Sequence, residues 1–240
     1  MRLRVLKTQL ILALLLAIAS ASGFVIERGD DASLHIIAFG DSLSAGQGLS
    51  VEAGFPGALE TRLRADGYNA RVINAGVPGD TSSMGLARLK DIVRKRADLV
   101  ILEFGANDVL RQVEPSVFRN NLDAMINGLK ARRIRVLVAG MNAAPEFGLD
   151  YKRAFDSVYP ELASAHAVAL HPFLLERMFD AQGHLIRAFL QGDGAHPNAD
   201  GIRRIVGDIA SLVERELDAI VSGPNRMVTR LTLQAAISDQ

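Results

Sequence analysis

The chain has 240 residues, of which 49% are hydrophobic, enough for one α/β domain with a substantial buried core. Its 27 lysines and arginines balance 27 aspartates and glutamates, so the formal charge is zero and nothing favours nucleic acid or an anionic membrane surface as the main partner. It contains no cysteine, which excludes a disulfide framework and a lipid-modified cysteine.

Residues 1–21 have the layout of a secretory signal peptide. Three basic side chains come first: Arg2, Arg4 and Lys7. An uncharged run over residues 10–21 follows and ends in small side chains. This run is shorter than the roughly 20 residues of a spanning helix, which favours cleavage, but apolar character resumes at residues 24–26 and leaves an uncleaved membrane anchor as the alternative. Because the basic residues precede the apolar run in both cases, we expect the domain to be periplasmic or secreted.

From residue 34 onward, short apolar runs alternate with longer amphipathic stretches, which is the pattern of βα units around a parallel sheet. The apolar runs predict five strands, mostly buried on both faces, over residues 34–39, 71–74, 99–104, 135–140 and 167–170. The amphipathic stretches predict helices over residues 55–66, 83–95, 116–132, 150–165 and 198–220. We therefore expect an α/β fold with one domain over residues 33–220, followed by a tail of unknown role over residues 221–240.

The predicted loops at the ends of the strands contain the candidate site. In an open parallel sheet, ligands bind beyond the carboxyl ends of the strands. Ser42 follows the first predicted strand, Gly79 lies in the loop after the second, and Asn107 follows the third. Asp193 and His196 lie just before the last predicted helix. We expect these residues to meet at one edge of the sheet.

The residue types suit nucleophilic catalysis. A serine hydroxyl is a weak nucleophile at neutral pH, so it needs a base within hydrogen-bond reach and a third group to orient that base. Asp193 and His196, three residues apart across a glycine-containing turn, can supply both to Ser42. A tetrahedral oxyanion also needs donors from another side. The backbone N–H groups of Ser42 and Gly79 and the side-chain amide of Asn107 are the candidates, since glycine permits close backbone approach and asparagine is a neutral donor.

Each candidate also has a plainer interpretation. Glycine, aspartate and serine are common turn residues, so Ser42 and Gly79 are each compatible with a simple turn. Asn107 is compatible with a helix cap. Asp193 and His196 are compatible with a metal site, although no second histidine or acidic cluster at ligand spacing accompanies them. Four blocks at strand ends in one chain favour the catalytic interpretation.

Other polar residues near these loops are expected to be structural. Three carboxylates adjoin the candidate loops, and we expect them to support the loops by accepting backbone hydrogen bonds: Asp41, Glu103 and Asp108. We expect the remaining histidines to be surface or packing residues: His35, His166, His171 and His184.

At these blocks the sequence resembles the SGNH, or GDSL, family of serine hydrolases, whose motif blocks match Ser42, Gly79, Asn107 and His196. The resemblance covers residues 34–217 and is nearest to bacterial periplasmic enzymes described as thioesterase, lysophospholipase and arylesterase. It implies a flavodoxin-like, three-layer α/β/α fold around a five-stranded parallel sheet, the SGNH hydrolase fold.

The same resemblance implies roles for particular residues. It implies a catalytic triad of Ser42, His196 and Asp193, and an oxyanion hole formed by Ser42, Gly79 and Asn107. It also implies a mobile loop over residues 109–114 that covers the acyl chain. Close relatives often have glycine where this chain has Ala106 in the third block, a change that leaves the asparagine donor in place and alters the edge of the pocket.

The function implied is hydrolysis of small-molecule carboxylic esters or thioesters through an acyl-enzyme on Ser42, with no cofactor and no metal. A carbohydrate O-acetyl esterase of the same family is an alternative, although 5% aromatic residues and no tryptophan disfavour a sugar-stacking surface. A non-catalytic phosphate or nucleotide binding module is an alternative of another class, but the P-loop lysine and the G-x-G-x-x-G spacing are missing. We expect a monomer that binds no nucleic acid and whose membrane contact is limited to an uncleaved N-terminal segment or a lipid substrate.

Overall fold

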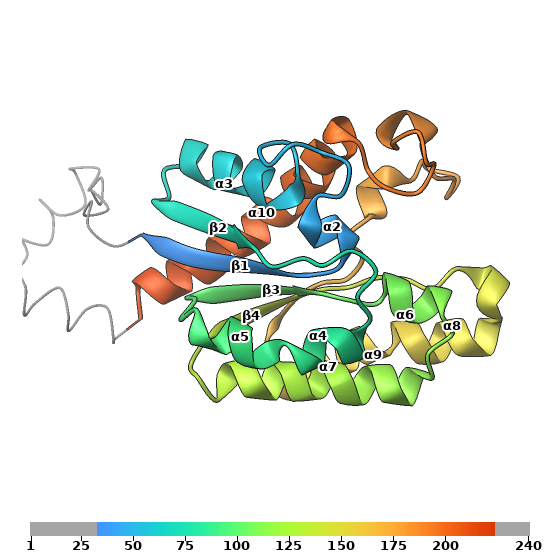
Figure 1. Cartoon of the computed structure of the whole chain (residues 1–240), viewed down its shortest axis with the longest axis horizontal. Helices are drawn as coiled ribbons and strands as arrows, with labels where there is room; N and C mark the ends of the chain where they lie inside the picture. Colours follow the sequence, from blue (N-terminus) through green and yellow to red (C-terminus); the bar gives the residue numbers. More distant parts are fainter. Residues whose placement is uncertain (1–32, 224–240) are drawn as a thin grey trace, which may run out of the picture. The chain divides into compact units, whose positions relative to one another are not determined.

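The centre of the structure is a five-stranded, all-parallel sheet with the strand order β2-β1-β3-β4-β5 (Figure 1). The strands are Leu34–Gly40 (β1), Ala70–Asn74 (β2), Leu99–Glu103 (β3), Arg135–Ala139 (β4) and Ala169–His171 (β5). The first four agree with the predicted ranges to within one residue, and β5 begins two residues later than predicted. The predicted α/β class and five-stranded parallel sheet are confirmed.

The structure is a computed structural model that describes residues 33–223. The predicted signal peptide over residues 1–21 and residues 224–240 of the tail predicted over residues 221–240 lie outside the described residues; Val221, the first residue of that predicted tail, is the last residue of the final helix. Within the described range, no helix is both long enough and apolar enough to cross a bilayer.

The helices are Ser42–Ala45 (α2), Phe55–Ala65 (α3), Ser82–Ala87 (α4), Leu89–Arg94 (α5), Ala106–Leu110 (α6), Pro115–Lys130 (α7), Leu149–Asp156 (α8), Val158–His166 (α9) and Ala199–Val221 (α10). Three short 3₁₀ helices span Pro145–Phe147, Glu176–Met178 and Arg187–Phe189. The short helices α2 and α6 were not predicted, because one helical turn contains too few residues to establish a period.

Two predicted helices are each divided in two. The helix predicted over residues 83–95 is interrupted at Arg88, whose backbone leaves helical geometry with φ −101° and ψ 9°. The helix predicted over residues 150–165 is interrupted at Ser157. Pro160 follows three residues later; it has no N–H to donate to the carbonyl four residues earlier, so a continuous helix through this point would lose a hydrogen bond.

Helices cover both faces of the sheet, as Figure 1 shows. Alternate residues of β1 point to opposite faces, so Ile36 packs with α3 and α10 while Ile37 and Phe39 pack on the other side with α7 and α9. All three of these β1 side chains are fully buried. The predicted three-layer α/β/α architecture is therefore confirmed, and both faces of the sheet are closed to substrate.

The strand order leaves one place for a site. The chain runs from β1 outward to β2 and then returns to β3 on the other side of β1, so the connections leaving β1 and β3 diverge at their carboxyl ends. Such a switch point is where open parallel sheets form a crevice. Gly40 at the end of β1 is in register with Glu103 at the end of β3, which places the loops after these two strands side by side.

Candidate active site

Ser42 is the first residue of α2, immediately after the end of β1. Asp41 is the N-cap of this helix, and its carboxylate accepts the Leu43 N–H at 3.1 Å. The strand ends at Gly40, where any Cβ would collide with the carbonyl and carboxylate oxygens of Glu103 on β3. The absence of a side chain at Gly40 therefore lets the chain turn closely against β3 and hold Ser42 at the carboxyl edge of the sheet.

Ser42, His196 and Asp193 form a continuous hydrogen-bonded line. His196 Nε2 lies 3.0 Å from Ser42 Oγ, and His196 Nδ1 lies 2.6 Å from Asp193 Oδ2. A carboxylate only accepts, so Nδ1 carries the proton of this bond and Nε2 of a neutral imidazole is left to accept from the serine hydroxyl. The three residues that the sequence predicted to act together are brought together.

The Asp193 carboxylate is ionised and held in place by its own loop. Its second oxygen accepts the backbone N–H groups of Ala195 at 2.9 Å and of His196 at 3.0 Å. The Ala195 bond, followed by the bonds from His196, lowers the pKa of Asp193 to about 2. Gly194, with φ +71°, gives the turn the left-handed residue it needs. The loop thus presents a fixed negative charge to the imidazole.

A glutamine that the sequence analysis missed anchors this loop. The Gln191 side-chain amide donates to the carbonyls of Gln47, at 2.7 Å, and of Pro197, at 2.9 Å. The Gln191 backbone N–H donates to the His196 carbonyl at 2.8 Å. Gln47 directly follows the C-cap of α2, so Gln191 connects the serine segment to the histidine segment. A glutamine in a loop carries no sequence signal for such a contact, because its partners are distant backbone carbonyls.

Gly79 is the third residue of a tight turn from Val77 to Asp80. The Asp80 N–H donates to the Val77 carbonyl at 3.1 Å, Pro78 is the second residue, and Gly79 has φ +83°, a combination typical of a type II turn. The positive φ explains why glycine is needed here. The turn's own hydrogen bond does not use the Gly79 N–H, and the Gly79 carbonyl accepts Arg111 Nη2 at 3.0 Å. Gly79 is therefore both a turn glycine and a candidate oxyanion donor.

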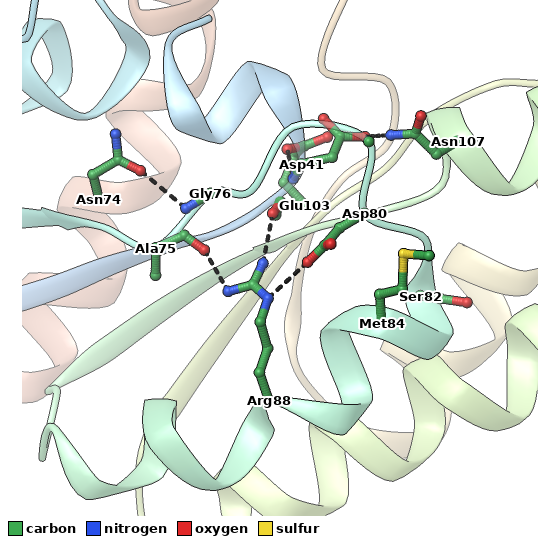
Figure 2. Close-up of polar contacts among 12 residues, drawn as sticks. Asp41, Asn74, Ala75, Gly76, Asp80, Ser82, Met84, Arg88, Glu103 and Asn107 are labelled. Atoms are coloured by element: carbon green, nitrogen blue, oxygen red, sulfur yellow. Dashed lines mark hydrogen bonds and ion pairs between the residues drawn. The ribbon is translucent and has the colours of Figure 1, made fainter.

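Asn107 lies in the first turn of α6 and points toward the serine turn (Figure 2). Its side-chain Nδ2 donates to Asp41 Oδ2 at 3.0 Å. The helix-cap alternative is wrong, because the N-cap of α6 is Gly105 and has no side chain to cap with. One N–H of the Asn107 amide is used by Asp41, which orients the amide and leaves its second N–H as a donor.

A buried pair of carboxyl groups lies beneath the serine turn. Glu103 Oε2 accepts the Ser44 hydroxyl at 2.8 Å and the Asp41 N–H at 3.2 Å, while the buried Oε1 has no hydrogen-bond partner in the described structure. Burial, together with the charge of Asp41, raises the pKa of Glu103 well above its usual value, and burial also raises the pKa of Asp41. Burial disfavours the charged form of both carboxyl groups, and we assign the stronger effect to Glu103.

The remaining expectations for polar residues agree with the structure. Asp108 accepts the Ser82 hydroxyl at 2.6 Å and the Ser82 N–H at 2.9 Å, which ties α6 to α4. His171 is buried at the end of β5, where its Nε2 lies 3.1 Å from Asp208 on α10. His166 pairs with Asp123 at 2.6 Å. The two histidine pairs stabilise packing between elements, and Asp108 supports the helix that carries Asn107.

A small, open hollow lies beside Ser42 and His196. Its apolar lining is Leu43, Leu49, Pro197 and Ile202, and Gly46 and Gln47 complete it. Within residues 33–223, no group of three or more histidine, aspartate or glutamate side chains is placed to hold a metal ion. The site is thus a polar hydrogen-bonded line next to a small apolar recess.

The fold has three layers, α/β/α, and a serine, a histidine and an aspartate are hydrogen-bonded in line at the carboxyl edge of its parallel sheet. This combination is typical of the serine hydrolases. Comparison with known proteins agrees with this class. Residues 38–204 match the GDSL-like Lipase/Acylhydrolase family. The chain belongs to this family and is therefore an acylhydrolase, an enzyme that cleaves carboxylic esters or thioesters.

Similar relatives and solved structures cover most of the chain. Esterase TesA of Pseudomonas aeruginosa is 36% identical over 76% of this chain and 89% of its own. Thioesterase 1/protease 1/lysophospholipase L1 of Escherichia coli K12 is 34% identical over 69% of this chain and 76% of its own. The crystal structure of AlinE4, an SGNH-hydrolase family esterase, superimposes with a TM-score of 0.64 at 41% identity, covering 78% of this chain and 97% of that one.

The buried carboxyl pair predicts a pH-dependent difference in stability between the wild type and Glu103→Gln. Because the pKa of Glu103 is raised, the folded state binds more protons than the unfolded state above pH 4.5, the usual glutamate value. The wild type should therefore lose stability relative to the non-titrating variant as the pH rises, by up to about 1.4 kcal/mol per pH unit. Urea unfolding at several pH values measures this difference. The exposed Glu146→Gln is the control and should show no such trend; a pH-independent difference for Glu103→Gln would contradict the assignment.

Proposed function

We propose that this chain is a serine esterase or thioesterase in which Ser42 is the nucleophile, His196 the general base and Asp193 the group that orients it. The backbone N–H groups of Ser42 and Gly79 and the side-chain amide of Asn107 form the oxyanion hole. The observation that supports this proposal most strongly is the line of hydrogen bonds from Asp193 through His196 to Ser42, at 2.6 and 3.0 Å.

In the first step, Ser42 Oγ attacks the acyl carbon and its proton passes to His196 Nε2. A C–O bond forms, and the electron pair of the carbonyl double bond moves to the oxygen. Asp193 remains ionised, because its pKa is about 2, and it stabilises the imidazolium that forms. The negative oxygen is stabilised by preorganised donors whose dipoles need no reorientation.

The tetrahedral intermediate then collapses. The bond to the leaving alkoxide or thiolate breaks, His196 gives its proton to that group, and an acyl-enzyme remains on Ser42. In the second half, His196 takes a proton from water as the water oxygen attacks the acyl carbon, and the carbonyl electron pair again moves to the oxygen. The bond between the acyl carbon and Ser42 Oγ then breaks, His196 returns its proton to Ser42 Oγ, and the acid is released. The first product leaves before water reacts, so ping-pong kinetics are expected.

The substrate is an acyl ester or thioester of a small molecule. The apolar lining of the hollow beside Ser42 and His196 supports a hydrocarbon or aromatic substituent there. Similar proteins are named esterase, arylesterase, and thioesterase/lysophospholipase, which supports the same substrate class without separating its members.

We also propose that the enzyme is exported and acts as a monomer in the periplasm or outside the cell. The basic residues followed by the apolar run over residues 10–21 support export. The mass of the protein recovered from the exported fraction would separate a cleaved signal peptide over residues 1–21 from an uncleaved anchor.

Ser42→Ala should lose roughly 10⁴-fold or more in turnover, because the variant has no hydroxyl to form the acyl-enzyme. The purified domain would be assayed with an aryl ester, and an organophosphate would be used to label the wild type covalently. Labelling of Ser42 distinguishes an enzyme from a non-catalytic phosphate-binding module. Near-normal turnover by Ser42→Ala would refute the proposed nucleophile.

Asn107→Ala should lose about 10²-fold to 10³-fold in kcat with a smaller change in KM, since the oxyanion forms only after substrate has bound. The loss would be read from steady-state kinetics on the same ester. Asn120→Ala removes an exposed asparagine from α7 and is the matched control. An equal kcat for Asn107→Ala and the control would remove Asn107 from the oxyanion hole.

Substrate preference is measured on a panel that varies acyl length from acetyl to palmitoyl against oxygen-ester and thioester leaving groups. We expect oxygen esters or thioesters that carry a hydrocarbon or aromatic substituent to be cleaved with higher kcat/KM than an acetylated glycan. The reverse order would support the alternative of a carbohydrate O-acetyl esterase. The Ser42→Ala protein serves as the blank for every substrate.

A further inference from the structure

Arg88, at the junction of α4 and α5, donates hydrogen bonds to three acceptors on two segments of the chain (Figure 2). Its Nε donates to Asp80 Oδ2 at 2.7 Å, its Nη1 to the Ala75 carbonyl at 2.7 Å, and its Nη2 to the Gly40 carbonyl at 2.9 Å. The guanidinium group therefore links the end of β1 to the start of the loop after β2 and to the turn within that loop that contains Gly79.

Two of these acceptors adjoin the backbone donors proposed for the oxyanion hole. Gly40 is two residues before Ser42, and Asp80 directly follows Gly79. The Gly40 carbonyl also accepts the Val77 N–H at 3.1 Å, so this one oxygen holds both Arg88 and the start of the Gly79 turn. The separation of the Ser42 and Gly79 N–H groups thus depends on the Val77 bond and on the bonds that Arg88 makes to both segments.

The surroundings of Arg88 make these bonds strong and well defined. Its side chain is 23% exposed and that of Asp80 is 11% exposed, so the ion pair is largely shielded from water. The guanidinium lies over the Phe39 ring, 4.5 Å from its centroid, with the Phe104 ring at 5.9 Å. A planar, charged fork held against two buried rings has little freedom to move.

The Gly79 turn needs such support because it lies outside the sheet. Strand β2 ends at Asn74, and beyond it the backbone is bonded to β1 through the Ala75 and Val77 N–H groups, while the Gly79 carbonyl accepts Arg111 Nη2 at 3.0 Å. Gly79 itself has the conformational freedom of glycine. A displacement of about 1 Å in a catalytic donor can cost up to about 10²-fold in rate. A residue that fixes this turn against the serine turn therefore affects the transition state without contacting substrate.

We propose that Arg88 is a positioning residue for the oxyanion hole, which sets the separation and orientation of the Ser42 and Gly79 N–H groups through its bonds to Gly40, Ala75 and Asp80. This inference rests on the function proposed above for Ser42 and Gly79. Lysine at this position would keep the charge but cannot present three donors in one plane, so it would replace only part of the role of arginine.

The test compares Arg88→Met, Arg88→Lys and Asp80→Asn with the wild type. For each protein, kcat and KM are measured on a short-chain ester, and the inhibition constant is measured for a trifluoromethyl ketone that forms a tetrahedral adduct on the nucleophilic serine. Arg64→Met is the matched control, because Arg64 also donates to a backbone carbonyl, that of Ala70 at 3.0 Å, but at the other end of β2.

We expect Arg88→Met to lose about 10-fold to 10²-fold in kcat with KM nearly unchanged, and its affinity for the ketone to weaken by a similar factor. Arg88→Lys and Asp80→Asn should lose less than Arg88→Met, and in each variant kcat and the affinity for the ketone should fall by similar factors. Arg64→Met should keep its kcat even if its melting temperature falls. A role limited to stability would instead lower the melting temperature and leave kcat per folded molecule and the ketone affinity unchanged.

The proposal is overturned if folded Arg88 variants keep wild-type kcat and ketone affinity, or if KM rises while kcat is unchanged. If Arg88→Met does not fold, Arg88→Lys and Asp80→Asn decide by the same two measurements. Ser42→Ala, assayed in parallel, separates the two levels of inference. Hydrolysis that depends on Ser42 but is insensitive to Arg88 refutes only the role of Arg88, whereas hydrolysis that persists in Ser42→Ala refutes the proposed site itself.

Discussion

The parallel pairing of β1 with β3 is the constraint on which the rest of the site depends. It places Gly40 opposite Glu103, so the segments that leave these two strands start side by side and diverge at the carboxyl edge. Ser42 comes from one segment and Asn107 from the other, and the bond from the Asn107 amide to Asp41 joins them. A parallel sheet buried on both faces leaves its carboxyl edge as the natural place for chemistry, because the loops that leave neighbouring strands diverge there and form a crevice.

Beneath that edge, the protein keeps polar and charged groups in a largely apolar interior. Glu103 and Asp41 are almost completely buried, and Arg88 is mostly so. Burying such groups costs free energy unless they are hydrogen-bonded, and nearly every bond they make goes to the serine turn or to the loop that carries Gly79. The free-energy cost of burying these three side chains is consistent with a role in stabilising one arrangement of the site, as preorganised catalysis requires.

The sequence analysis predicted much of this architecture, and the omissions have a common cause. Runs of apolar residues predicted all five strands, since a buried strand needs apolar side chains on both faces. The breaks at Arg88 and Ser157 and the single-turn helices α2 and α6 escaped prediction because too few residues carry the pattern. In the site, residue type identified Ser42 and His196, but Gln191 gave no signal, because its role lies in contacts with backbone carbonyls far along the chain.

The sequence by itself determined the succession of the main strands and helices along the chain and the chemical identity of the groups at the strand ends, because both follow from residue type and local periodicity. Only the tertiary structure decided which groups meet. Ser42 and His196 are 154 residues apart, and their 3.0 Å contact depends on the sheet order and on where α10 begins. The same holds for the three acceptors of Arg88 and for the burial of Glu103 beneath the serine turn. Local patterns encode which side chains are present, whereas distances between remote segments arise only when the whole sheet is assembled.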